Sequence, residues 1–311
     1  MLSVGATLEA SQILIRAINE GRVLFTTLCK SNEVCAGPSA TNSANWQIIP
    51  GGRRAAKERR NFRANKGEFS RQPWHELELA RELQSAMLPA YHPPEAAWDL
   101  AVRSTAAQTI GGDFYDFFRY PGKAICAEAI GDASGKGASA AIHAALVAGI
   151  LRSLAPLELG PAEMLSRLNE VLLTRPIPGR YVSMIYATWD ERERVFRIAN
   201  AGLPYPLCVQ NEKIFALQVA GLPLGLFESA EYEEHTVTCE PGDLVVFYTD
   251  GITETMNSQG EDFGSERLER VIATNSLQPA EQVMSSIFLA AGFHAGNLDP
   301  VDDQTVIAVR T

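Results

Sequence analysis

Closely spaced strand-like segments limit the fold of this chain more than any other feature. Between residues 181 and 248, runs of apolar and β-branched residues follow one another with mostly short turns between them. Neighbouring strands joined by so few residues must pair antiparallel, because a parallel pair needs a crossover of about a dozen residues or more. A regular doubly wound parallel sheet is therefore excluded, and we expect an α+β fold in which helices cover two antiparallel sheets.

Hydrophobic periodicity and turn residues place the expected elements. Strands are expected at 99–105, 123–130, 181–189, 194–199, 205–209, 214–218, 234–239, 243–248 and 305–310. Helices are expected at 138–154, 161–173, 265–275 and 279–291.

A change in charge near residue 74 divides the chain. Residues 1–75 carry 11 Lys and Arg against 5 Asp and Glu, a net +6, whereas residues 76–311 carry 16 against 32, a net −16. The acidic part argues against nucleic acid as the main ligand. Residues 6–20 could form a short helix and 23–28 a strand, but the basic stretch 51–71 is typical of a linker or solvated tail.

A charged helix is expected to open the acidic part. In WHELELARELQSAMLP, Leu79, Leu83 and Met87 recur at helical spacing, and Pro89 ends the run. This apolar stripe needs a partner, either the following domain or a second copy in a short coiled coil, and the sequence leaves both open. We therefore expect a basic segment and linker at 1–73, a linker helix at 74–90 that could form a homodimer, and a catalytic domain at 91–311.

Composition excludes several other classes of protein. No uncharged apolar run reaches the length of a membrane span, about 18 residues, and the N-terminus lacks a signal-peptide layout, so we expect a cytoplasmic protein. The five cysteines include no C-x-x-C pair and the five histidines are scattered, which gives no support to a zinc site or a disulfide framework. The thiols are best interpreted as buried and reduced.

Four aspartate clusters carry the chemistry. They are IGGDFYD (110–116), GDASG (131–135), YTDG (248–251) and VDDQT (301–305). Taken alone, Asp132 could equally cap the Ala-rich helix that follows it. However, AICAEAIGD and LVVFYTD are both apolar strands that end in aspartate. If they are neighbours, carboxylates converge at one end of a sheet and form an oxygen-rich site for Mg²⁺ or Mn²⁺.

Three other known motifs do not match this sequence when they are compared residue by residue. The run from Gly131 to Lys136 is one residue short of a G-x-x-x-x-G-K-[ST] phosphate loop, and Gly137 stands at the hydroxyl position. Asp132 replaces the first glycine of a G-x-S-x-G motif around Ser134. The GGD at 111–113 is similar to that of diguanylate cyclases, but FYD follows it here in place of an acidic residue and Phe.

Several motifs in order resemble the SpoIIE/RsbU branch of the protein phosphatase 2C family. They are GGDFYDFF, IGDASGKGASAAI, YVSMIYATWD, ANAGLPYP, GLPLG, GDLVVFYTDGITETMN and DDQTVIAVR, preceded by a helix that ends in ELQSAMLP. The resemblance covers about residues 74–311 and leaves residues 1–73 outside it. It implies an α-β-β-α sandwich with two Mn²⁺ or Mg²⁺ ions at one end of the paired sheets.

The resemblance also implies a set of metal ligands. They are Asp113, Asp132, the backbone carbonyl of Ala133, Asp250 and Asp302. In this assignment Asp132 bridges the ions and Asp113 acts directly or through water, while Asp116 and Asp303 position waters or loops. Asp132 and Asp250 then act through a metal-activated water that attacks phosphorus in line, so no Cys or Ser nucleophile is needed.

The implied function is that of a metal-dependent phosphoserine/phosphothreonine protein phosphatase. Its implied substrate is a phosphorylated anti-sigma-factor antagonist in a bacterial partner-switching pathway. Two departures stand against this. Leu203 occupies the position where the family commonly has His in an AGH motif, and no sensor or receiver domain is recognisable upstream. A non-catalytic binding module with the same fold is therefore the alternative, and a nucleotide cyclase comes third.

Simpler roles are expected for other conspicuous residues. We expect His143 to be a packing residue on its apolar helix, Lys136 a solvated turn residue, and Glu254 a residue that orders its own loop. Phe114 and Tyr115 are expected to anchor the core.

Overall fold

The computed structural model describes residues 72–89 and 98–311. The chain divides into two units after Pro73, and the described residues belong almost entirely to the second, Trp74–Thr311. The expected helix at 6–20, the strand at 23–28 and the basic stretch at 51–71 lie outside the described residues.

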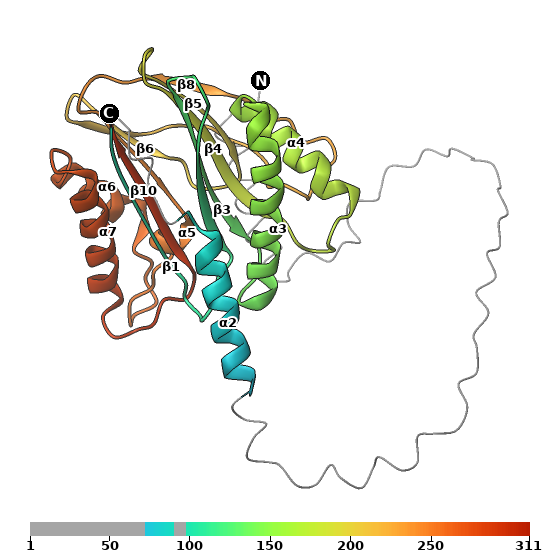
Figure 1. The fold of residues 1–311 in the computed structure, drawn as a ribbon. Helices are drawn as coiled ribbons and strands as arrows, with labels where there is room; N and C mark the ends of the chain where they lie inside the picture. The colour runs from blue at the N-terminus through green and yellow to red at the C-terminus, as the bar shows by residue number, and fades with distance from the viewer. Residues whose placement is uncertain (1–71, 90–97) are drawn as a thin grey trace, which may run out of the picture. The chain divides into compact units, whose positions relative to one another are not determined.

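Two five-stranded antiparallel sheets form the centre of the second unit (Figure 1). In spatial order the first sheet contains β1 (Asp99–Thr105), β10 (Gln304–Arg310), β9 (Leu244–Tyr248), β6 (Leu207–Gln210) and β7 (Lys213–Ala216). The second contains β2 (Asp113–Arg119), β3 (Ile125–Ala133), β4 (Val182–Asp190), β5 (Val195–Ala201) and β8 (His235–Thr238). The helices are α2 (Gln72–Met87), α3 (Ala138–Leu154), the 3₁₀ helix η1 (Ala155–Leu157), α4 (Pro161–Thr174), α5 (Asp250–Thr253), α6 (Gly264–Thr274) and α7 (Ala280–Ala295).

Three apolar clusters hold these elements in four layers. The first sheet, with edge strands β1 and β7, is called the β1–β7 sheet, and the second, with edge strands β2 and β8, is called the β2–β8 sheet. One cluster lies between the β2–β8 sheet and helices α3 and α4, and another lies between the β1–β7 sheet and helices α6 and α7. The third fills the space between the sheets. Successive side chains of β3 point to opposite faces of the sheet and so contribute to two of these clusters. Ala127 and Ala129 face α3, whereas Ile130 faces the other sheet. The expected α+β fold, an α-β-β-α sandwich, is confirmed.

The sequence-based elements match the structure apart from their ends and three omissions, namely β2, the 3₁₀ helix η1 and α5. Strand β2 was not expected, because the Gly-Gly-Asp turn signal hid the start of an aromatic run, DFYDFFR, that has high strand propensity. The short helix α5 was also not expected, since four residues give too little periodicity to detect.

Helix α3 owes its apolar composition to packing. Among the described helices, only the stretch Ala138–Leu157, which is α3 continued through η1, is long and apolar enough to cross a membrane by length and composition alone. Its residues Ala144, Val147 and Leu151 are buried in the cluster against the β2–β8 sheet. In this fold α3 is therefore a core helix of the sandwich.

Helix α2 contacts the sandwich near its C-terminal end. Leu88, just after it, packs against the cluster under α3, and Arg152 of α3 donates a hydrogen bond to the carbonyl of Met87. Leu79 and Leu83 remain 44% and 68% exposed. The expected apolar stripe is thus only partly covered by the described residues.

Candidate metal centre

Two of the predicted ligands lie side by side on the β2–β8 sheet. Asp113 opens β2 and is paired in register with Asp132 near the end of β3. Gly112 makes this approach possible, because a Cβ at that position would lie 2.6 Å from the carbonyl oxygen of Ala133 and 3.1 Å from Asp132 Oδ1. The structure therefore brings Asp113, Asp132 and the Ala133 carbonyl together.

The other two predicted ligands come from the opposite sheet. Asp250 follows β9 and begins α5, and Asp302 precedes β10, the antiparallel neighbour of β9. Their turns touch at Gly251, where a Cβ would lie 1.9 Å from the carbonyl oxygen of Asp303. Only glycine allows this contact, so the sequence Asp-Gly at the end of β9 has a steric reason.

Burial and mutual repulsion dominate the electrostatics of these carboxyl groups. Burial, followed by the charges of Asp113 and Asp250, raises the pKa of Asp132 well above its ordinary value. Burial, then Glu254 and then Asp302, raise the pKa of Asp250 to about 7. Crowded carboxylates that face one another across two sheets are stabilised by a nearby cation.

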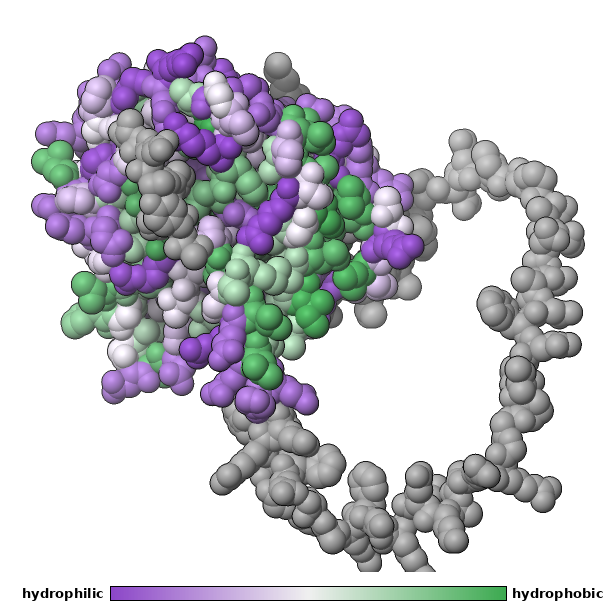
Figure 2. Space-filling view, in the orientation of Figure 1, coloured by the Kyte–Doolittle hydropathy of each residue, from purple (hydrophilic) through white to green (hydrophobic). Residues whose placement is uncertain are grey.

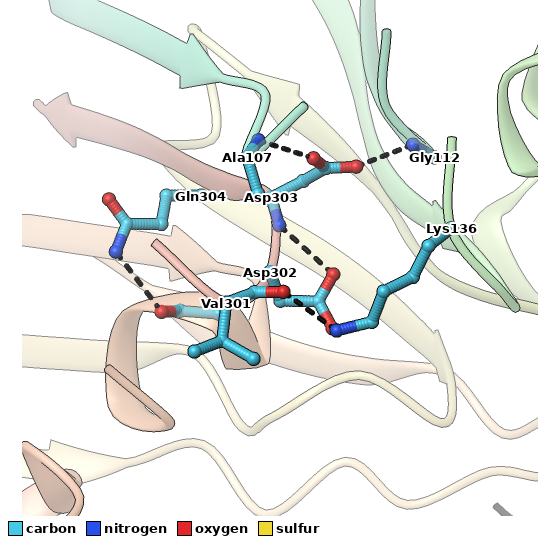
Figure 3. Close-up of polar contacts among 8 residues, drawn as sticks. Ala107, Gly112, Lys136, Val301, Asp302, Asp303 and Gln304 are labelled. Atoms are coloured by element: carbon cyan, nitrogen blue, oxygen red, sulfur yellow. Dashed lines mark hydrogen bonds and ion pairs between the residues drawn. The ribbon is translucent and has the colours of Figure 1, made fainter. Parts of the chain in front are cut away.

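Asp303 orders the loop that leads into β2 (Figure 3). Its carboxylate accepts hydrogen bonds from the backbone N–H of Ala107 at 2.8 Å and of Gly112 at 2.5 Å. The side chain is buried, and both of its oxygens are engaged. This contact holds the Gly111–Gly112 turn, and with it the start of β2, against the loop that carries Asp302.

Lys136 spans the gap between the two sides of the centre. Its Nζ donates to the carbonyl of Val301 at 2.7 Å and lies 3.5 Å from Asp302 Oδ2 (Figure 3). The side chain is half-exposed. Lys136 is exposed, as expected of a solvated turn lysine, and it also ties the loop after β3 to the loop before β10.

Asp116 is not brought to the cluster. It lies on the face of β2 that is opposite to Asp113, and its Oδ2 accepts a hydrogen bond of 2.5 Å from Arg152 Nε on α3. Arg152 also contacts the end of α2. Asp116 thus belongs to an ion pair under the helices.

The donor set suits a hard divalent cation. Among the described residues, no group of three or more Asp, Glu, His or Cys side chains is arranged so that it could already hold a metal ion. The groups that do converge are carboxylate and carbonyl oxygens, which fit Mg²⁺ or Mn²⁺ better than zinc or copper. The chemistry of these oxygen donors therefore fits the expected metals.

Leu203 is a core residue of an ordered loop. It is buried in the cluster between the sheets. Asn200 holds the loop, because its side chain accepts a hydrogen bond from Leu203 N and donates to the carbonyls of Leu203 and Val219, each at 2.9 Å. The loop order that a histidine at this position could supply is here provided by Asn200.

Sequence reasoning missed three polar residues around the centre. Thr249 and Thr305 donate hydrogen bonds to Asp113, and Gln84 of α2 makes two hydrogen bonds to the backbone of Gly111. The threonines are adjacent to the predicted aspartates in YTDG and DDQT, so their position in the motifs was the available signal. Gln84 gave no signal, because a polar residue on a charged helix is unremarkable.

The packing roles expected for other residues are confirmed. His143 is buried on α3, Phe114 is buried beneath the helices, and Tyr115 packs against the layer between the sheets. Cys126, Cys208 and Cys239 are free and buried. The remaining two cysteines lie outside the described residues.

Solved structures share this fold. The SiaA-PP2C domain of Pseudomonas aeruginosa matches with a TM-score of 0.71 at 20% identity, covering 78% of this chain and 98% of that domain. RsbX, solved in complex with magnesium, matches with a TM-score of 0.51 at 18% identity, covering 70% and 96%.

Sequence relatives agree with the structural ones. Phosphoserine phosphatase RsbU of Bacillus subtilis is 26% identical over 237 residues, which cover 76% of this chain and 70% of RsbU. A sequence profile of the family described as Stage II sporulation protein E matches residues 125–311, more than half of the chain. On this combined match of sequence and fold, the chain belongs to the SpoIIE family and is a SpoIIE/RsbU-type protein serine/threonine phosphatase of the protein phosphatase 2C fold.

Proposed function

We propose that this phosphatase requires two Mn²⁺ or Mg²⁺ ions and acts on a phosphorylated anti-sigma-factor antagonist in a partner-switching pathway. The observation that carries the proposal is the convergence of Asp113 and Asp132 from one sheet with Asp250 and Asp302 from the other. The named activity of RsbU, phosphoserine hydrolysis, supports the substrate class. The cytoplasm, where such a pathway operates, is the proposed location.

In this proposal each group has a defined task. Asp132, Asp250 and Asp302, with the Ala133 carbonyl, would hold the ions, and Asp113 would bind directly or through water. When bound, the ions would supply a hydroxide near neutral pH and stabilise the charge that develops on the phosphoryl group. Asp303 keeps the β2 turn in place through its two backbone hydrogen bonds.

Metal-dependent hydrolysis of p-nitrophenyl phosphate and of a phosphorylated antagonist tests the proposal. We expect activity with Mn²⁺, loss of activity with EDTA, and a loss of about 100-fold or more in Asp132→Ala and Asp250→Ala. Asp299→Asn is the matched control, because it removes an exposed negative charge from the loop before β10. Turnover that is indifferent to metal and to both alanine variants would refute the mechanism.

A non-catalytic binding module is the alternative function. Leu203 favours it, since the residue that the family commonly has there is missing. The same assay separates the two functions, because a binding module would retain a phosphorylated antagonist without hydrolysing it. A nucleotide cyclase would instead consume a nucleoside triphosphate that is added to the same assay.

We also propose that the helix at 74–90 acts as a dimerisation element before a catalytic domain at 91–311. Exposed apolar side chains support this, namely Leu79 and Leu83 on α2 and Ile142 and Leu146 on α3, and Figure 2 shows hydrophobic residues gathered along this side. Sedimentation of a Leu79→Glu/Leu83→Glu variant should give a monomer where the wild type gives a dimer. A dimer that survives both substitutions, or a monomeric wild type, would contradict this assignment.

A further inference from the structure

Two threonines from one sheet converge on a single carboxylate oxygen of the other. Thr249, directly after β9, donates from Oγ1 to Asp113 Oδ2 at 2.9 Å, and Thr305 on β10 donates to the same oxygen at 2.6 Å. Both threonines are 0% exposed, and Asp113 is 6% exposed. These hydrogen bonds therefore bridge the two sheets inside the protein, at the end where the aspartates meet.

The direction of each hydrogen bond in this group is fixed by chemistry. In the ionised state that binds a metal, the Asp113 carboxylate only accepts, so both hydroxyl protons point to it. Thr305 Oγ1 lies 2.8 Å from Ser104 Oγ on β1, and because its own proton is used, Ser104 must be the donor there. The backbone N–H of Thr305 donates to Thr249 Oγ1 at 2.9 Å, which locks the second hydroxyl in the same way.

This arrangement leaves the two oxygens of Asp113 unequal. Among the hydrogen bonds of the described residues, those to Asp113 use Oδ2 and leave Oδ1 available for a cation or a water. Burial, together with the charges of Asp303 and Asp250, raises the pKa of Asp113 well above its ordinary value, and the hydrogen bonds from Thr305 and Thr249 oppose this rise. The geometry therefore holds one oxygen of Asp113 and presents the other to the centre.

We propose that Thr249 and Thr305 are positioning residues that hold Asp113 across the gap between the sheets as a metal-binding carboxylate. Ser104 is the outer member of this hydroxyl chain. The inference rests on the proposed function, because it takes the aspartate cluster as the metal centre. Partners of this kind behind a ligand typically contribute about 10-fold to 100-fold in metal affinity.

Calorimetric titration of the metal-free full chain with Mn²⁺ tests the inference without relying on turnover. Thr249→Val and Thr305→Val keep the side-chain shape and remove the hydroxyl, and we expect each to weaken the Mn²⁺ Kd about 10-fold or more. Thr305→Ser restores the hydroxyl and should return the Kd to within about 3-fold of the wild type. Thr188→Val, at a buried threonine on β4 that faces the helices, is the matched control and should leave the Kd unchanged.

Turnover supplies the second readout. If the hydroxyls act through Asp113, the valine variants should need more Mn²⁺ for half-maximal rate and regain most of kcat at saturating Mn²⁺. Circular dichroism in EDTA establishes that each variant is folded, and Ser104→Ala, which removes only the outer hydroxyl, replaces any valine variant that is not folded and should weaken the Kd about 3-fold.

The outcomes separate this inference from the proposed function. Folded valine variants with the wild-type Kd, beside an active wild type, would overturn the inference alone. A wild type that binds Mn²⁺ but has no phosphatase activity would overturn the proposed function alone. A wild type that binds no Mn²⁺ would overturn both.

Discussion

Glu128 places a carboxyl group in the apolar layer between the sheets. It lies on β3 on the same side as Ile130, opposite Phe117 on β2 and Ala187 on β4. The residue is 5% exposed, and neither carboxyl oxygen has a hydrogen-bond partner among the described residues. Burial raises its pKa from the ordinary value of 4.5 to about 8.

Glu128 should therefore make stability fall as the pH rises. Below pH 4.5 the group is protonated in both the folded and the unfolded chain and costs nothing. Between the two pKa values the unfolded chain releases the proton while the folded chain keeps it, so the unfolded state gains stability. With about 1.4 kcal/mol for each pKa unit, the loss is about 3 kcal/mol at pH 7 and approaches about 5 kcal/mol above pH 8.

The substitution Glu128→Gln removes this titration with little change of shape. The free energy of unfolding, measured by urea denaturation at about pH 5.5, 7 and 8.5 in EDTA, should favour the variant increasingly as the pH rises, by about 3 kcal/mol between the extremes. Subtracting the wild-type value cancels the titration of the aspartates, which both proteins share. Glu228→Gln, at an exposed glutamate, is the control and should show no trend. A difference that stays constant with pH would refute the reasoning, since the carboxylate would then be ionised and solvated in the folded protein.

Three further predictions concern contacts around the centre. Gln84→Leu removes both hydrogen bonds from α2 to the turn before β2, and we expect an increase of about 3-fold or more in the Mn²⁺ concentration for half-maximal rate, measured by titrating activity with Mn²⁺. Lys136→Met removes a positive charge beside Asp302, so calorimetry should show Mn²⁺ binding tightened by up to about 5-fold, whereas weaker binding would show that the lysine only braces its loop. Arg152→Leu leaves the buried Asp116 without its ion pair and should lower the free energy of unfolding by about 2 kcal/mol in urea denaturation, an effect that Asp116→Asn should partly reverse.

The architecture could be predicted from the sequence because its signals are local. Short connections force antiparallel pairing, and the expected ranges for β1 and α3 coincide with the structure. Strand β2 shows the limit of this approach. Its first residue, Asp113, belongs both to a glycine turn and to a strand. The turn signal does not indicate that the residues after the turn pair with another strand.

The candidate site could be predicted only at the level of its aspartates. Motif order indicated which carboxylates to group, but strand alternation decides which face each one reaches. Asp113 and Asp116 lie three positions apart on β2 and therefore point to opposite sides of the sheet. Thr249 and Thr305 stand in the aspartate motifs, but their hydrogen bonds, like that of Lys136, join segments that are far apart in the chain, and position in a motif does not reveal the partner.

The position of the centre follows from the way in which the two sheets meet. Burial and dispersion between the sheets are non-directional, so hydrogen bonds set the register of the two sheets more sharply than the apolar layer does. Directional hydrogen bonds from Thr249 and Thr305 to Asp113, and from Ala107 and Gly112 to Asp303, join the sheets at the end where the aspartates lie. These bonds fix the separation of the carboxylates that the two sheets contribute. The same polar contacts that specify the packing of the sandwich therefore also set the dimensions of the proposed metal centre.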